Sequence, residues 1–252
     1  MIYTEVLIMI TVKPFNSAGV ILSYKCSSKC RHCLYCCSDE WRGWMDKDMM
    51  LRIFREVLDS TPVIRGFHLA GGEAFLNFPL LLEITKIAKQ NMIPLDYVET
   101  NASWYKSQAS AEKKLSKLKD AGLNSILISC SPLHAEHIPF EKTLGVINAS
   151  FKIFGRLGTM IWLPEFLNDL TTLSINGTIS FTDYADAMGK EHAVAAASYY
   201  GQLIPGGRAP YRLGDYLPVW PKETFFEGNC SYELLKSGSG HFDLYGNTIP
   251  GI

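Results

Sequence analysis

Five of the seven cysteines in this 252-residue chain lie within twelve positions. Three of them, Cys26, Cys30 and Cys33, have the spacing C-x3-C-x2-C, and Cys36 and Cys37 follow closely. An even distribution would place only about 0.3 cysteines in such a stretch. A secreted disulfide scaffold would be smaller and would spread its cysteines over several loops. The spacing therefore indicates a metal site in a reducing compartment, and we expect a cytoplasmic protein.

Three thiolates on one short loop suit a [4Fe-4S] cluster in which three irons have a cysteine ligand and the fourth is open to a small chelating ligand. The spacing Cys30-x2-Cys33-x2-Cys36 is a competing ligand set. It keeps open a non-catalytic iron–sulfur electron-transfer protein, which normally closes its cluster with a fourth cysteine. A zinc module is a third interpretation, but zinc ligands usually come as two separated pairs.

The cysteines follow a short apolar segment, residues 18–23, that predicts a β-strand. Further strand patterns begin near positions 64, 95, 125, 159 and 199, and amphipathic helical segments separate them. Asp46 is a predicted N-cap, and Gly122 is predicted to end a helix over 108–121. This alternation predicts an α/β fold, a partial (β/α)6 barrel with mainly parallel strands and an irregular C-terminal tail.

Polar and sulfur-bearing residues follow the predicted strands, where parallel α/β folds carry their sites. The net charge, 24 Lys+Arg against 25 Asp+Glu, argues against nucleic acid as a partner. Apolar runs of about 18 residues, which would cross a membrane, are absent from the sequence. We therefore expect neither nucleic-acid nor membrane partners.

Two motifs together resemble the radical S-adenosylmethionine (SAM) superfamily. The first is Cys26-Ser-Ser-Lys-Cys30-Arg-His-Cys33 after the first strand, and the second is Ala70-Gly71-Gly72-Glu73 after the second strand. The resemblance implies a [4Fe-4S] cluster on the three cysteines and SAM at its open iron.

The same resemblance implies which residues surround SAM. Gly71 and Gly72 would let the strand edge approach the ligand, since they carry no side chain. Glu73 would accept hydrogen bonds from the SAM ammonium, and His32 would pack beside SAM as the family's aromatic residue does. Weaker motif matches add four cofactor-binding candidates: Asn101, Ser129, Ser131 and Arg208. The chain has no Asp where relatives often have Ser-x-Asp after the fourth strand.

The resemblance implies an oxidoreductase that works anaerobically. It would cleave SAM reductively to a 5′-deoxyadenosyl radical, which abstracts hydrogen from a substrate the sequence does not identify. Such an enzyme needs a ferredoxin- or flavodoxin-type electron donor. No catalytic residue beyond the cofactor sites is predicted.

The C-terminal tail indicates which class of substrate to expect. Cys230 and residues 241–250 resemble the start of the auxiliary-cluster (SPASM-type) extension of peptide-modifying members, so a peptide or protein side chain is the first expectation and a small molecule the alternative. We accordingly divide the chain into an extension (1–16), a radical SAM core (17–210) and a tail (211–252), which we interpret as a truncated auxiliary-cluster region. His134 and His137 are interpreted as a pair at a helix start, not as metal ligands.

Overall fold

The computed structural model describes residues 11–61, 66–200, 203–226, 228 and 230–250. They form a seven-stranded open sheet in the order β5-β4-β3-β2-β1-β6-β7, in which only the β6–β7 pair is antiparallel. The fold is α/β with an unclosed, mainly parallel sheet, as predicted. The strands are β1 (Ser17–Ile21), β2 (Gly66–Ala70), β3 (Leu95–Thr100), β4 (Ser125–Ser129), β5 (Thr159–Trp162), β6 (Ser239–Phe242) and β7 (Thr248–Pro250).

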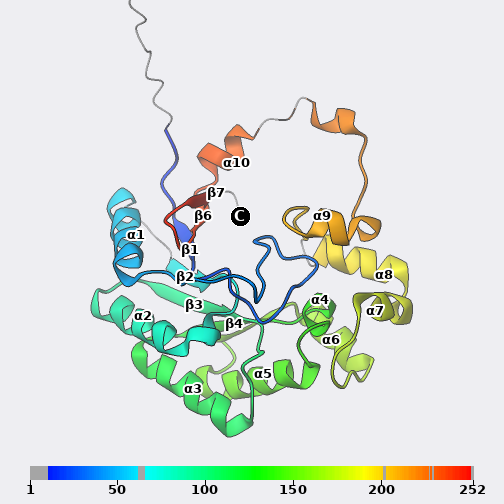
Figure 1. The fold of residues 1–252 in the computed structure, drawn as a ribbon, viewed down its shortest axis with the longest axis horizontal. Helices are drawn as coiled ribbons and strands as arrows, with labels where there is room; N and C mark the ends of the chain where they lie inside the picture. Colours follow the sequence, from blue (N-terminus) through cyan, green and yellow to red (C-terminus); the bar gives the residue numbers. More distant parts are fainter. Residues whose placement is uncertain (1–10, 62–65, 201–202, 227, 229, 251–252) are drawn as a thin grey trace, which may run out of the picture.

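Helices cover one face of this sheet, and the other face lies towards the loop that carries the cysteines (Figure 1). None of the helices in the described ranges has the length and apolar character needed to cross a bilayer. The α-helices are α1 (Lys47–Ser60), α2 (Phe78–Gln90), α3 (Gln108–Ala121), α4 (Pro132–Ala135), α5 (Phe140–Phe154), α6 (Pro164–Thr172), α7 (Phe181–Met188), α8 (Lys190–Ala195), α9 (Ala209–Arg212) and α10 (Ser231–Lys236).

Strand alternation separates the two faces of the sheet. Val20, Leu69, Val98 and Ile126 are fully buried and belong to the main core with residues of α1, α2, α3 and α5. The residues between them in each strand face the other way, which leaves polar side chains on the inner face of the sheet. This inner face is the one that an open barrel offers to ligands.

Local signals set several element ends. Asp46 Oδ1 accepts hydrogen bonds from the backbone N–H groups of Asp48 (2.9 Å) and Met49 (3.2 Å), which begins α1 as predicted. Gly122 ends α3 with a φ of 116°, a left-handed conformation that glycine adopts without strain.

The predicted strand over 198–204 is wrong. Residues Ala196–Tyr200 form a π-helical turn that continues α8, and residues 201–202 lie outside the described range. An alanine-rich segment precedes the turn, and Ala193 and Ala196 pack side by side in a second core with Phe181 and Tyr184. Helix propensity and this packing therefore override the apolar strand pattern. The helical segment that precedes this turn is divided into α7 and α8 at Gly189.

The tail contains an ordered element that the sequence did not predict. Strands β6 and β7 form a hairpin, and β6 pairs in parallel with β1 at the edge of the predicted sheet. Asp243 closes the hairpin turn by accepting from the backbone N–H groups of Tyr245 and Asn247, both at 2.9 Å. Tyr24 donates its hydroxyl to Asp243 Oδ2 at 3.0 Å, which joins the hairpin to the cysteine-bearing loop.

Candidate functional site

The predicted ligands lie in a closed loop between β1 and α1, residues 22–45, which we call the cysteine loop. Backbone hydrogen bonds join its two sides: Cys26 N–H donates to the Ser38 carbonyl at 2.8 Å, and Met45 N–H donates to the Leu22 carbonyl at 2.7 Å. The loop leaves the sheet at the carboxyl end of β1 and returns to the same place. The cysteines of this loop therefore lie at the edge of the sheet where the sequence analysis expects a site.

The three predicted ligands lie within eight consecutive residues of the cysteine loop. Cys26 and Cys30 are buried and Cys33 is half-buried. Burial raises the pKa of Cys26 to about 11. The pKa of Cys30 is also raised, first by burial and then by the neighbouring charges of Cys26 and Cys33. The three thiols are therefore near enough to influence each other's ionisation.

Hydrogen-bond donors point at two of these sulfurs. Cys26 Sγ accepts from the Ser28 backbone N–H and from Asn101 Nδ2, both at 3.4 Å. Cys33 Sγ accepts from the Cys37 backbone N–H at 3.3 Å. Thiolates are the metal-ligating form of cysteine, and N–H donors to sulfur stabilise them and tune iron–sulfur clusters. The residues present therefore fit a [4Fe-4S] cluster held by Cys26, Cys30 and Cys33.

The two remaining loop cysteines differ from each other. Cys36 is exposed, with a positive φ of 52°. Cys37 is buried, and its thiol hydrogen-bonds to Cys33, which together with the Cys37 N–H lowers the pKa of Cys33 to about 6. The sequence analysis did not predict that Cys37 would contact the sulfur of a predicted ligand, whereas Cys36 donates its backbone N–H to the Cys33 carbonyl at 3.3 Å.

The glycine pair after β2 lies against the backbone of the cysteine loop. Gly72 N–H donates to the Ser23 carbonyl at 2.7 Å. A Cβ atom on Gly72 would overlap the Lys25 carbonyl, and Gly71 has a φ of 115°. Residues without a side chain are therefore required for the loop to pack on the strand edge, as well as for the predicted approach to SAM.

Glu73 is buried and bridges two strand ends. Its carboxylate accepts from the backbone N–H of Phe75 (3.1 Å), the hydroxyl of Thr100 (2.9 Å) and the backbone N–H of Asn101 (2.7 Å). Burial raises the pKa of Glu73 to about 7. An ionised carboxylate has about four acceptor positions, so these three donors leave one for a ligand. The role of Glu73 towards the SAM ammonium stays a prediction.

The other SAM-binding candidates lie along the same edge of the sheet. Asn101 Nδ2 donates to the Ser27 hydroxyl at 3.2 Å, and Ser129 is half-buried at the end of β4. Ser131 caps α4 and its hydroxyl lies 2.8 Å from His134 Nδ1. The His134 ring packs edge-on against His32, with centroids 4.7 Å apart.

The structure brings these groups to one edge, while their contacts with SAM stay predictions. The His32 ring has a buried Nδ1 without a hydrogen-bond partner in the described part of the chain. Such an orphaned nitrogen is expected where a ligand completes the site.

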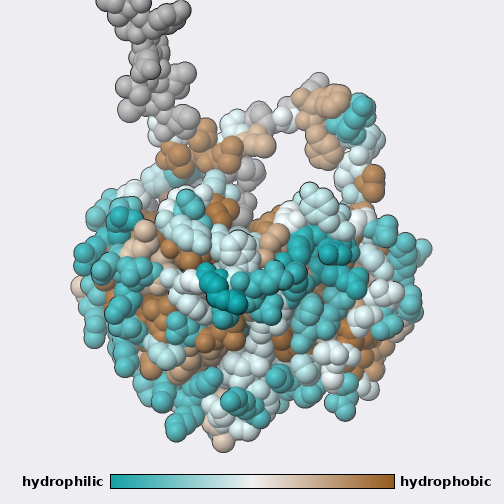
Figure 2. All heavy atoms as spheres, in the orientation of Figure 1, coloured by the Kyte–Doolittle hydropathy of each residue, from teal (hydrophilic) through white to brown (hydrophobic). Residues whose placement is uncertain are grey.

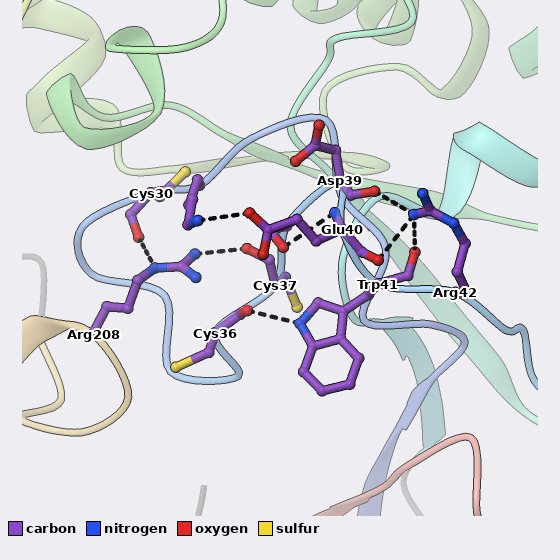
Figure 3. A network of polar contacts seen from close by, with 10 residues as sticks. Cys30, Cys36, Cys37, Asp39, Glu40, Trp41, Arg42 and Arg208 are labelled. Atoms are coloured by element: carbon purple, nitrogen blue, oxygen red, sulfur yellow. Dashed lines mark hydrogen bonds and ion pairs between the residues drawn. The ribbon is translucent and has the colours of Figure 1, made fainter.

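Arg208, which directly precedes α9, donates hydrogen bonds to the backbone of the cysteine loop. Its Nε donates to the Cys30 carbonyl at 2.9 Å, and its Nη2 donates to the Cys37 carbonyl at 2.7 Å (Figure 3). Its backbone N–H donates to the Cys33 carbonyl at 3.2 Å. The sequence analysis gave Arg208 as a cofactor-binding candidate, and in the structure its guanidinium donates to the loop backbone.

A basic concavity adjoins this contact and was missed by the sequence analysis. It has a volume of about 780 Å³ and four cationic side chains line it: Lys29, Arg31, Arg208 and Arg212. Glu136 also lines it and pairs with Arg31 at 2.9 Å. Hydrophilic side chains gather on this face of the molecule (Figure 2). The four cations come from two segments about 180 residues apart, so no local motif signals them.

An open, mainly parallel α/β sheet with a cysteine-bearing loop after its first strand places the chain in the class of α/β proteins. Within this class, the chain belongs to the radical SAM superfamily, because the model of that superfamily matches residues 20–148. This match spans β1 to α5 and contains both motifs. No curated protein matches the sequence.

Solved structures resemble this fold. SuiB from Streptococcus suis, bound to S-adenosylmethionine, is 14% identical with a TM-score of 0.51, over 95% of this chain and 61% of that chain. BtrN, in complex with AdoMet and 2-DOIA, is 17% identical with a TM-score of 0.42, over 60% of this chain and 57% of that chain. The chain therefore spans about three fifths of the length of these structures.

Proposed function

We propose that this protein is a radical SAM enzyme whose [4Fe-4S] cluster is held by Cys26, Cys30 and Cys33. When bound, the reduced cluster supplies the electron that cleaves SAM to methionine and a 5′-deoxyadenosyl radical, which abstracts hydrogen from a second substrate. The observation that carries the proposal is the packing of the three-thiol loop on the Gly71-Gly72 edge, inside the region that matches the superfamily.

The chain's own residues would position the reactants. Glu73 has one acceptor site left for the SAM ammonium and is fixed by Thr100 and Asn101, so binding would need no rearrangement of that carboxylate. The half-buried His32 ring, backed by His134, would form a wall beside SAM. The buried loop and strand edge would exclude water and stray hydrogen donors from the radical.

The basic concavity supports an acidic ferredoxin- or flavodoxin-type electron donor as the partner. Lys29 and Arg31 belong to the cysteine loop, and Arg208 contacts the Cys30 and Cys37 carbonyls directly. An electron donor bound there would contact the loop that carries the predicted ligands. Opposite charge would also steer the encounter, which raises the association rate at low salt.

We propose a peptide or protein side chain as the second substrate, in a cytoplasmic and oxygen-poor setting. Support for a peptide comes from the resemblance of residues 241–250 to the start of a SPASM-type extension. Support for the setting comes from seven free cysteines, five of them close together.

The test is anaerobic reconstitution with iron and sulfide, followed by dithionite and SAM. We expect 5′-deoxyadenosine in the wild type and none in a Cys30→Ala variant. A protein that carries a full cluster and yields no 5′-deoxyadenosine would support the electron-carrier alternative and refute the enzyme.

A further inference from the structure

Three polar side chains meet on the inner face of the sheet, apart from the residues assigned to the cluster and SAM. They are His68 of β2, His241 of β6 and Glu99 of β3, which we call the inner-face trio. Gly19 of β1 is in register with both histidines, and a Cβ atom at Gly19 would overlap both imidazoles. The missing side chain lets the two rings meet across the intervening strand, with their Nε2 atoms 3.0 Å apart.

Aromatic rings hold the pair in place. Tyr97 stacks on His68, with ring centroids 4.8 Å apart and planes 8° from parallel. Tyr35, which belongs to the cysteine loop, packs on His241 at 5.8 Å. The inner-face trio therefore adjoins the loop that carries the predicted cluster ligands, where a second substrate must lie if a radical generated at that loop is to reach it.

Burial gives these groups an unusual charge state. It lowers the pKa of His68 to about 3 and that of His241 to about 4, so both imidazoles are neutral at pH 7. Burial also raises the pKa of Glu99 to about 7. Glu99 Oε1 lies 3.8 Å from His68 Nε2, and no Lys or Arg within the described ranges forms an ion pair with it. The inner face therefore offers a carboxyl group without a counter-cation.

One nitrogen of the trio also lacks a partner. His241 is 8% exposed, and its Nδ1 is buried without a hydrogen bond to any described residue. A histidine pair that served only to attach the β6–β7 hairpin would be expected to satisfy its buried polar atoms. The trio therefore combines an unpartnered nitrogen on His241 with a carboxyl group, that of Glu99, which has no counter-cation, and both point to a ligand that is polar and charged.

We propose that the inner-face trio binds a protonated amine or guanidinium group of the second substrate. A carboxylate, a neutral imidazole and two tyrosine rings are together the surroundings that stabilise an organic cation. The proposal rests on the proposed function for the existence of a second substrate.

The ammonium group of SAM is also an organic cation. The site for the cation of the second substrate must therefore be distinguished from the site for SAM. The two carboxyl groups have different partners: Glu73 accepts hydrogen bonds from Thr100 and Asn101, whereas Glu99 lies beside His68. We assign the trio to the second substrate, so SAM and an amine should bind at the same time.

The test uses the reconstituted full chain with histidine rings labelled with ¹⁵N, and n-butylammonium chloride as the probe. Butan-1-ol, which has the same length and no charge, is the matched control ligand. We expect saturable shifts of the His68 and His241 ring resonances with butylammonium, with and without saturating SAM, and much weaker shifts with butanol. Glu99→Gln should weaken butylammonium binding at least about tenfold, as expected for loss of one charge-assisted hydrogen bond.

Tyr24→Phe is the matched control variant, since it removes the hydrogen bond of Tyr24 to the hairpin without altering the trio. It should bind the probe as the wild type does. Equal effects of butanol and butylammonium, unchanged affinity in Glu99→Gln, or the absence of saturable shifts would each overturn the proposal. Displacement of the probe by SAM would assign the trio to SAM and overturn it as well. Because the shifts do not depend on SAM cleavage, this result and the 5′-deoxyadenosine test can fail separately.

Discussion

The cysteine loop and the inner-face trio are two neighbouring sites built in opposite ways. The loop takes its predicted ligands from eight consecutive positions, 26–33, and fixes them with backbone hydrogen bonds and with the Arg208 guanidinium. The trio takes His68, Glu99 and His241 from three separate strands and fixes them by ring packing across Gly19. Tyr35 connects the two, because it belongs to the loop and contacts His241.

Under the proposed function, this difference matches two tasks. Binding of a cofactor that is common to a whole superfamily can be encoded in a short motif with a fixed loop geometry. Binding of the second substrate would use side chains from distant strands. The predictions below alter one site or its support at a time, from the largest effect to the smallest.

The largest effect is expected from the predicted ligands. Replacing Cys26, Cys30 or Cys33 by Ala should abolish the cluster absorbance near roughly 400 nm and all SAM cleavage, since each removes one iron ligand. Cys36→Ala should retain both, because Cys36 is exposed. Absorbance retained in Cys26→Ala and lost in Cys36→Ala would favour the competing ligand set, and absorbance retained in all three ligand variants would refute the assignment.

The second largest effect is expected where the strand edge packs against the cysteine loop. Gly72→Ala would force a Cβ atom against the Lys25 carbonyl, and we expect it to lower the free energy of unfolding by roughly 2 to 3 kcal/mol. Urea denaturation measures the loss. Gly214→Ala is the control, because a Cβ atom there has nothing within 4 Å. Equal stability of the two variants would contradict the tight packing of strand edge and loop.

The basic concavity predicts a kinetic effect that depends on salt. Arg212→Glu should lower kcat/KM for reduction by a flavodoxin about tenfold at low ionic strength, and the difference should shrink as salt screens the charges. Reduction by dithionite should be unchanged. Lys117→Glu on α3, which lies on the helical side of the sheet, is the control. An equal loss in both variants would indicate a general charge effect and exclude this docking surface.

The smallest effect concerns Glu99. Its folded pKa is raised, so its contribution to stability is complete at pH values below the ordinary range of a glutamate and is lost as pH rises through about 7. Between pH 5 and pH 8 the wild type should therefore lose stability relative to Glu99→Gln. We expect about 1 kcal/mol, since part of the side chain is exposed and screened.

Thermal unfolding at the two pH values measures this difference, and Glu165→Gln, at an exposed position, should show no such trend. If the stability difference between the wild type and Glu99→Gln is the same at both pH values, the pKa of Glu99 is not raised by burial.

Much of the fold was predictable from the sequence because βα units leave local signals. The strands that begin near 95, 125 and 159, the Asp46 cap and the Gly122 helix end all follow from apolar periodicity and turn chemistry. The π-helical turn at Ala196–Tyr200 was not predictable, because the residues from 198 onwards fit a strand pattern and the sequence does not show that Ala196 belongs to one core with Phe181. The β6–β7 hairpin was hidden because β6 pairs with β1, more than 200 residues away in sequence.

The candidate site shows the same division. Spacing alone identified Cys26, Cys30 and Cys33 as ligands, which stays a prediction, and it marked Gly71 and Gly72, whose close approach in the structure is to the cysteine loop. The contacts of Arg208 with the loop carbonyls, and of Cys37 with Cys33, depend on side-chain geometry that spacing does not specify. His68 had a signal that could have been used, since strand alternation places it on the opposite face from Phe67 and Leu69. Its partner His241 had none, because it required the hairpin.

The most direct test of the central claim is the EPR spectrum of the reduced, reconstituted protein with and without SAM. A cluster held by Cys26, Cys30 and Cys33 alone has one iron open, so saturating SAM should change the g values and line shape of the signal. A fully reduced cluster whose spectrum does not respond to SAM would show that no iron is available to it, and would contradict the account.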